Sequence, residues 1–343
     1  MSRLEKTLEI RTSPHIVSGH GVDTIMFNVV LALAPITLFA VYAFGLAALL
    51  TLVVALASCL ATEHLICRLT GRASTVRDWS VTITGLLYGL TLPPGLPLWM
   101  TAAGGFIAVA MGKWLFGGLG SNPFNPALVG RAVLQAAFPA AMTSWVPAFL
   151  PGRFATLPSS VLTFPFAEPV YDAVSGATPL SAWKFDRAAA SSRDLLMGVT
   201  SGSTGETCAA LILLGGLYLI ARNMMNWRIP VAILATVAVA SGALHLADPA
   251  RYASPAFMLL SGGLMLGALF MASDMVGSPM TPLGASLYGV VIGLLVVVIR
   301  TWGGMPEGVM YAILLGNALT PQIDARIRPR VYGTGRRERE TRA

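Results

Sequence analysis

The chain has 343 residues, of which 55% are hydrophobic and 11% are charged, and its mean hydropathy is +0.69. This composition excludes a soluble domain and predicts an all-α integral membrane protein. The formal net charge is +7, but the basic residues lie at the ends of apolar runs and in the C-terminal tail, which argues against nucleic-acid binding.

Ten apolar runs are long enough to cross roughly 30 Å of hydrocarbon as helices of about 20 residues. In chain order they are 22–43, 45–66, 79–96, 98–117, 125–148, 206–222, 229–246, 255–275, 282–301 and 304–322. Prolines interrupt the third run and the fifth run. The sequence therefore predicts about ten transmembrane helices, some of them broken at Pro or Gly.

The distribution of Lys and Arg predicts the orientation, because cytoplasmic segments of membrane proteins are enriched in both. Most basic residues fall in segments that share one side if the N-terminus is inside. We expect a cytoplasmic N-terminal segment at 1–21, a basic cytoplasmic tail at 324–343, and an external, periplasmic loop at 150–205.

The two remaining blocks, 22–149 and 206–323, resemble each other weakly. Gly85-Leu-Leu-Tyr-Gly-Leu in the third run and Gly263-Leu-Met-Leu-Gly-Ala in the eighth are each followed by a Pro/Gly-rich break. Each block holds five helices, and because five is odd, the second block starts on the opposite side of the bilayer from the first. The two five-helix repeats are therefore expected to be inverted in the bilayer, with binding sites at the breaks. Coincidence is the alternative, because Gly-Leu pairs are common in membrane helices.

A second feature is the loop Asn122-Pro-Phe-Asn125-Pro between the fourth and fifth runs. The two amides can donate and accept hydrogen bonds, which suits recognition of a planar heterocycle such as an isoalloxazine ring. A Pro/Asn turn that caps the fifth helix explains the same residues equally well.

The third feature is Ser175-Gly176-Ala177-Thr178, which lies in the one long polar loop and follows Asp172. A short run of small residues that ends in a hydroxyl suits an enzyme that grips the backbone and esterifies the hydroxyl. We interpret Thr178 as a flavin attachment site, and a plain Ser/Gly turn is the alternative.

These features together resemble a known family. The segment from Asp172 to Thr178 is similar to the D-x-x-S/T-G-A-T/S sequence at which a flavin transferase esterifies FMN through its phosphate. With Asn-Pro-Phe-Asn-Pro at 122–126, Ser13-Pro14-His15 and the ten-helix plan, the chain resembles the NqrB/RnfD family over nearly its whole length. That family comprises RnfD, a membrane component of the Rnf electron-transport complex, and NqrB, its relative in the Na⁺-translocating NADH:quinone reductase.

The resemblance implies the cofactors. Thr178 carries covalent FMN as a phosphoester, and Asn122 and Asn125 line a second, non-covalent flavin site for riboflavin. The recognition sequence for the transferase is formed by Asp172, Ser175, Gly176 and Ala177.

Charged residues at membrane depth are functional candidates, because hydrocarbon solvates charge poorly. Asp274 precedes the break at 277–282 and is our candidate for an ion route. The other candidates lie near helix ends and can extend to the interface instead. They are Asp23, Glu63, Lys113, Arg131, Arg300 and Glu307. Neither the three cysteines nor the histidines have the spacing of a metal site, so none is expected.

The sequence thus predicts a flavoprotein subunit of a bacterial ion-pumping oxidoreductase in the inner (cytoplasmic) membrane. Electrons moving between NADH and ferredoxin pass through its flavin, and this transfer is coupled to Na⁺ or H⁺ translocation. The expected partners are the other membrane and peripheral subunits, the flavin transferase and the lipid bilayer. The alternatives are a secondary transporter with inverted repeats and no redox cofactor, or a purely structural anchor.

Overall fold

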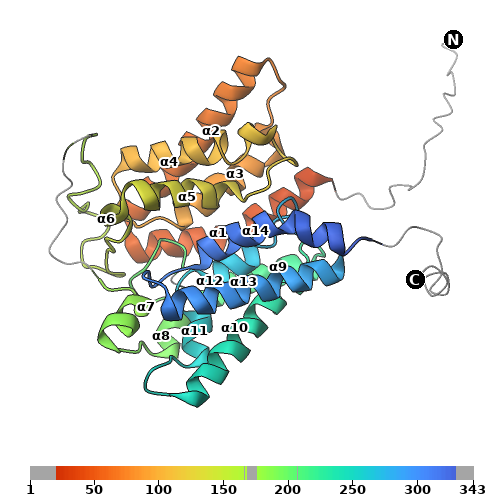
Figure 1. Ribbon diagram of the computed structural model, residues 1–343. Helices are drawn as coiled ribbons and strands as arrows, with labels where there is room; N and C mark the ends of the chain where they lie inside the picture. The colour runs from red at the N-terminus through yellow and green to blue at the C-terminus, as the bar shows by residue number, and fades with distance from the viewer. Residues whose placement is uncertain (1–20, 166, 168–175, 207, 330–343) are drawn as a thin grey trace, which may run out of the picture.

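The computed structural model describes residues 21–165, 167, 176–206 and 208–329. Within these ranges the chain is all helical and has no strand. Two groups of helices lie side by side in Figure 1, one formed mainly by α2 to α5 and the other by α9 to α14. Short helices and loops between residues 138 and 208 connect the two groups.

The first group contains five main helices. They are α1 (Val22–Phe44), α2 (Leu46–Thr70), α3 (Ser80–Leu90), α4 (Leu98–Ala110) and α5 (Pro126–Ala137). Two 3-10 turns, η1 (Val76–Asp78) and η2 (Trp114–Phe116), flank α3 and α4. The helix expected at 125–148 is shorter than predicted, because α5 ends at Ala137 and Pro139 opens the separate four-residue helix α6 (Pro139–Met142).

The connection holds more structure than a plain loop. It contains α7 (Pro179–Ser181), the π-helical turn η3 (Ala182–Asp186) and α8 (Ser192–Met197). The second group follows with α9 (Ala209–Ala221), α10 (Arg228–Ala247), α11 (Pro255–Leu260), α12 (Leu264–Leu266), the π-helical turn η4 (Gly267–Met271), α13 (Pro282–Trp302) and α14 (Val309–Arg326).

Five helices among the described residues are long and apolar enough to cross a membrane. They are Val22–Phe44, Leu46–Thr70, Leu98–Phe116, Arg228–Ala247 and Pro282–Trp302. Helices α3 and α9 are apolar but shorter, and the eighth predicted run is divided into α11, α12 and η4 around Gly262, which has a φ of 64°. The chain is therefore a multi-pass membrane protein with broken helices, as the composition predicts.

Glycines bring pairs of helices close together. Gly85 and Gly89 of α3 face α2, where an added Cβ at Gly85 would lie 2.9 Å from the Leu56 Cα. Gly289 and Gly293 of α13 face α10 in the same way, with distances of 2.6 Å to the Ala232 Cβ and 2.7 Å to the Thr236 Cβ. This spacing of small residues is typical of closely packed membrane helices, which associate through van der Waals contact.

Candidate functional site

The segment that ends at Thr178 is held on one side by the loop after α6. The Gly176 N–H donates to the carbonyl oxygen of Trp145 at 2.9 Å. A Cβ at Gly176 would lie 2.2 Å from the Ser201 Oγ, so a larger residue does not fit here without a shift. Ala177 is exposed and Thr178 is partly exposed. Asp172 and Ser175 lie outside the described residues.

Thr178 is the N-cap residue of α7. Its Oγ1 accepts a hydrogen bond from the Ser181 N–H at 3.2 Å, its ψ of 152° is extended, and Pro179 occupies the first helical position. Helix α7 runs directly into η3, which ends at Asp186 and is followed by Arg187 with a φ of 56°. The hydroxyl is thus fixed at the start of a helical segment rather than placed in a loose turn.

A small cavity lies beneath Thr178. Its volume is about 20 Å³, and Thr178, Ser201, Glu206 and Glu307 are among its lining residues. A second cavity of about 10 Å³ is lined by the same two glutamates and by Arg131. Each volume is close to that needed for a single water molecule. Polar side chains therefore continue from Thr178 into the interior of the helix bundle.

Two ion pairs occupy that interior, one buried and one partly buried. The Arg131 Nη1 of α5 lies 3.0 Å from the Glu206 Oε1, and the Arg300 Nη2 of α13 lies 3.3 Å from the Glu307 Oε1. The Gly263 N–H also donates to Glu307 at 3.0 Å, at the break between α11 and α12. Arg131, Arg300 and Glu307 were sequence candidates, whereas Glu206 was not among them.

A larger cavity lies between the two groups of helices. It has a volume of about 90 Å³, and it brings together Asn122, Asn125 and Asp274 from two distant parts of the chain. Helices α1, α3, α5 and α9 and the turn η4 supply the other walls. The three residues that the sequence singled out separately thus surround one space.

The two asparagines differ in how many of their side-chain polar atoms are hydrogen-bonded. Asn125 caps α5, because its Oδ1 accepts from Ala127 N–H at 3.1 Å and from Leu128 N–H at 3.4 Å, while its Nδ2 donates to the Met271 carbonyl at 3.3 Å. Asn122 donates from Nδ2 to the Phe124 carbonyl at 3.2 Å, but its buried Oδ1 has no partner in the described chain. The expected capping turn is present, and one acceptor remains for a ligand.

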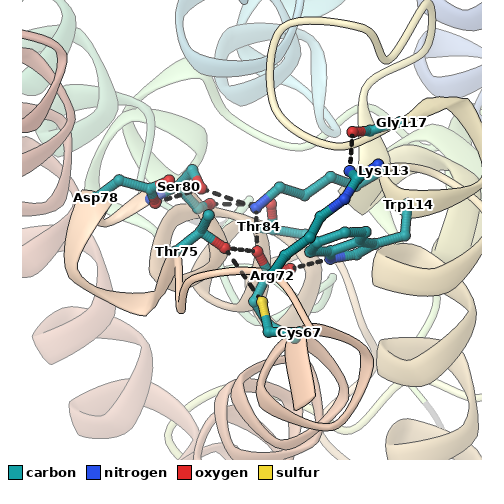
Figure 2. Close-up of polar contacts among 10 residues, drawn as sticks. Cys67, Arg72, Thr75, Asp78, Ser80, Thr84, Lys113, Trp114 and Gly117 are labelled. Carbon is teal, nitrogen blue, oxygen red and sulfur yellow. Dashed lines mark hydrogen bonds and ion pairs between the residues drawn. The ribbon is translucent and has the colours of Figure 1, made fainter. Parts of the chain in front are cut away.

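Lys113 closes another wall of this cavity. Its Nζ lies 2.7 Å from Oε1 of the fully buried Glu63 and 3.0 Å from the Ser80 Oγ. Figure 2 shows Lys113 pointing toward Ser80, with Trp114 and Thr75 nearby. Trp114 Nε1 donates to the other Glu63 oxygen at 2.7 Å, and the Thr75 hydroxyl donates to Oε1. The carboxylate therefore receives three donors and holds the ammonium group in place.

Asp274 follows η4 at the edge of the same cavity. Its Oδ1 accepts from the Val276 N–H at 3.3 Å. The next break is anchored to α14, since the Gly277 carbonyl accepts from the Asn317 Nδ2 at 2.9 Å and from the Thr320 Oγ1 at 2.8 Å. The broken segment is thus fixed by its own polar contacts, and the Asp274 side chain borders the open space.

Comparison with known proteins gives the family. The model of the NQR2, RnfD, RnfE family matches residues 9–333. This chain belongs to that family. It is similar to the D subunit of the proton-translocating ferredoxin:NAD(+) oxidoreductase complex of Clostridium ljungdahlii, with 39% identity over 95% of this chain and 96% of the relative.

Other members of the NQR2, RnfD, RnfE family are equally similar. The D subunit of the Na(+)-translocating ferredoxin:NAD(+) oxidoreductase complex of Acetobacterium woodii is 39% identical, over 99% of both chains. The D subunit of the ion-translocating oxidoreductase complex of Halorhodospira halophila is 40% identical, over 96% of both chains. Since relatives at the same identity are named for different ions, overall similarity within the family does not identify the ion.

Proposed function

We propose that this chain is the flavin-carrying membrane subunit of an Rnf-type complex that couples electron transfer between NADH and ferredoxin to Na⁺ or H⁺ translocation. Family membership and the names of the relatives support the complex. The observation that carries the flavin part is the position of Thr178, whose partly exposed hydroxyl is fixed at the start of α7 next to a polar cavity.

The surroundings of Thr178 fit a phosphoester. Small residues precede the hydroxyl, so a transferase can approach the backbone closely. A phosphate on the Thr178 oxygen would lie next to the Ser181 N–H, which donates to the Thr178 Oγ1. FMN attached there supplies redox chemistry, and tethering keeps it near its electron-transfer partners at high effective concentration. The other complex subunits and a flavin transferase are the partners that this proposal requires.

The second flavin, riboflavin, is proposed to bind between the two groups of helices. The unpartnered Oδ1 of Asn122 offers an acceptor for a ring N–H, and Lys113 places a cation at the cavity wall. Asn125 contributes less to binding, because capping of α5 and the Met271 carbonyl already use its amide. Asp274, on the same cavity, remains our candidate for the ion route.

We further propose that the bundle consists of two inverted five-helix repeats, ten spanning segments in all. Matching contacts support this arrangement: α2 packs against α3 and α4, and α10 packs against α11 and α13, while α4 contacts α5 as α13 contacts α14. Lys113 and Arg300, near the ends of α4 and α13, contact Ser80 and Met258 respectively. These shared contacts are what two copies of one five-helix plan would produce.

The orientation is part of the same proposal. We place both termini in the cytoplasm of a bacterium, the protein in its inner membrane, and the Thr178 segment in the periplasm, on the basis of the Lys/Arg asymmetry.

Replacement of Thr178 tests the flavin proposal. Thr178→Ala is expected to abolish flavin fluorescence of the chain after denaturing electrophoresis, while Thr178→Ser retains part of it, because esterification needs the hydroxyl and not the methyl group. Both variants are expected to insert and assemble, since one partly exposed residue contributes little to packing. A fluorescent Thr178→Ala chain contradicts the proposal, and a wild-type chain without flavin favours a transporter or an anchor.

A further inference from the structure

A cavity of about 140 Å³ lies at the end of the bundle where α10 and α13 finish. The turn η3, the connection between α10 and α11, and the last residues of α13 form its walls. The flavin proposal does not account for this cavity, which shares Arg300 with the charged interior. Its lining contains four cationic side chains and, among the described residues, no carboxylate. The cations are Lys184, Arg187, Arg251 and Arg300.

The protein itself holds the two more buried cations, Lys184 and Arg300, and leaves one donor of Arg300 without a partner among the described residues. Lys184 Nζ donates to the carbonyl oxygens of Arg300 at 3.4 Å and Met305 at 3.0 Å, and also to that of Gly303. Partial burial lowers the pKa of Lys184, an effect that a nearby anion would oppose. Arg300 is paired with Glu307, but its buried Nε has no partner in the described chain.

The two exposed cations are held over aromatic rings. The Arg187 guanidinium lies 5.7 Å from the centre of the Trp183 ring and donates to the Arg251 carbonyl at 2.7 Å. The Arg251 guanidinium lies 5.6 Å from the Tyr252 ring. Neither forms a salt bridge within the part of the chain that the structure describes. Two ordered guanidinium groups therefore remain available to an anion at the mouth of the cavity.

The rim of the cavity has the composition of a membrane boundary. Tyr252 and Trp302 pack edge to face with ring centres 6.3 Å apart, shortly after the end of one candidate span and at the end of another. Trp302 is 56% exposed, and Leu246, which follows the residue His245 that contacts the Tyr252 carbonyl, is 85% exposed. Aromatic residues collect at the level of the lipid headgroups, and exposed apolar side chains beside them suit acyl chains.

We propose that this cavity binds the phosphate group of an anionic phospholipid, with the headgroup between Arg187 and Arg251 and the acyl chains against Trp302 and Leu246. Arg187 and Arg251 have no carboxylate partner among the described residues, which favours an anionic ligand, and the apolar rim at the ends of two spans favours a lipid over free phosphate. The lipid would bind beside η3, which continues the helical segment that Thr178 caps. It would therefore fix the Thr178 segment against the membrane surface.

Lipid titration of the delipidated chain in detergent tests the proposal. Retention of phosphatidylglycerol by the delipidated chain is measured by native mass spectrometry, for the wild type and for Arg187→Gln with Arg251→Gln. We expect the double variant to weaken phosphatidylglycerol binding about tenfold or more, because each basic residue near a charged membrane contributes measurable attraction. Phosphatidylcholine is expected to bind weakly to both chains.

The matched control removes Arg222, which follows α9, and Arg228, the first residue of α10, which also lies over a ring, that of Trp227, at 5.1 Å. This variant is expected to retain the tight site. Equal loss from both variants, or no loss from either, overturns the proposal. Displacement of the lipid by millimolar inorganic phosphate would identify a free-phosphate site instead and would also overturn it. Lipid binding is expected to persist in Thr178→Ala, so the result is independent of the flavin.

Discussion

Asn125 makes two kinds of contact at once, since its Oδ1 caps α5 and its Nδ2 contacts the Met271 carbonyl. Both interpretations of the loop at 122–126, a capping turn and a ligand contact, were open from the sequence because Asn serves either purpose. The structure separates them by residue. Asn125 caps α5, and Asn122 carries the acceptor that has no partner among the described residues. Local residue order predicted the loop but not this division, which depends on contacts with η4.

The two asparagines should therefore respond differently to substitution. Asn125→Ala is expected to lower stability by about 1 kcal/mol through loss of the cap. Asn122→Leu is expected to leave stability nearly unchanged but to remove non-covalent flavin, because the buried acceptor disappears. Thermal unfolding and flavin extraction from the purified chain measure both effects, with flavin at Thr178 as the internal control. If Asn122→Leu retains all of its extractable flavin, the loop at 122–126 is only a turn and does not bind flavin.

The pair formed by Glu63 and Lys113 illustrates what residue-level reasoning misses. Each was singled out as a charged residue near a helix end, but fifty positions separate them in the sequence and no local pattern joins them. We expect Lys113→Met alone to destabilise the chain by about 3–5 kcal/mol, because it leaves a buried carboxylate without its cation. Lys113→Met combined with Glu63→Leu should recover much of that loss. A double-mutant cycle on thermal unfolding checks this, and strictly additive losses would show that the pair is not coupled.

At the scale of helices, the prolines and glycines of the sequence predicted the positions of helix breaks better than they predicted helix lengths. Pro139 ends the fifth predicted run early, because a proline cannot donate the next helical hydrogen bond. The break at Gly262 and the π-helical turn η4 depend on contacts with Glu307 and with neighbouring helices, which the sequence alone does not reveal.

The close contact of α13 with α10 gives a prediction at this scale. Gly289→Leu should strongly lower the unfolding temperature in detergent, because even a Cβ at this position would lie 2.6 Å from the Ala232 Cβ. Gly304→Leu is the matched control, since nothing lies within 4 Å of a Cβ there. Similar unfolding temperatures for the two variants would show that the α10–α13 contact is not tight.

For the whole molecule, composition was sufficient to predict a multi-pass helical protein. The sites could not be predicted in this way, because they form only where the two groups of helices contact each other. The cavity at Asn122 and Asp274 exists only where distant segments face each other. Reporter fusions test the proposed orientation: a reporter after residue 75 or 225 should be active only in the cytoplasm, and one near 190 only in the periplasm. A cytoplasmic signal at 190 would place Thr178 on the wrong side for the proposed attachment.

Mass mapping of the purified wild-type chain tests the central claim most directly. Trypsin cleavage after Arg153 and Lys184 yields a peptide with Thr178, whereas Thr200 and Thr204 fall in the peptide that follows Arg193. We predict FMN mass on the first peptide, with fragmentation assigning it to Thr178. Flavin on Thr200 or Thr204, or no covalent flavin on either peptide, would contradict covalent attachment at Thr178.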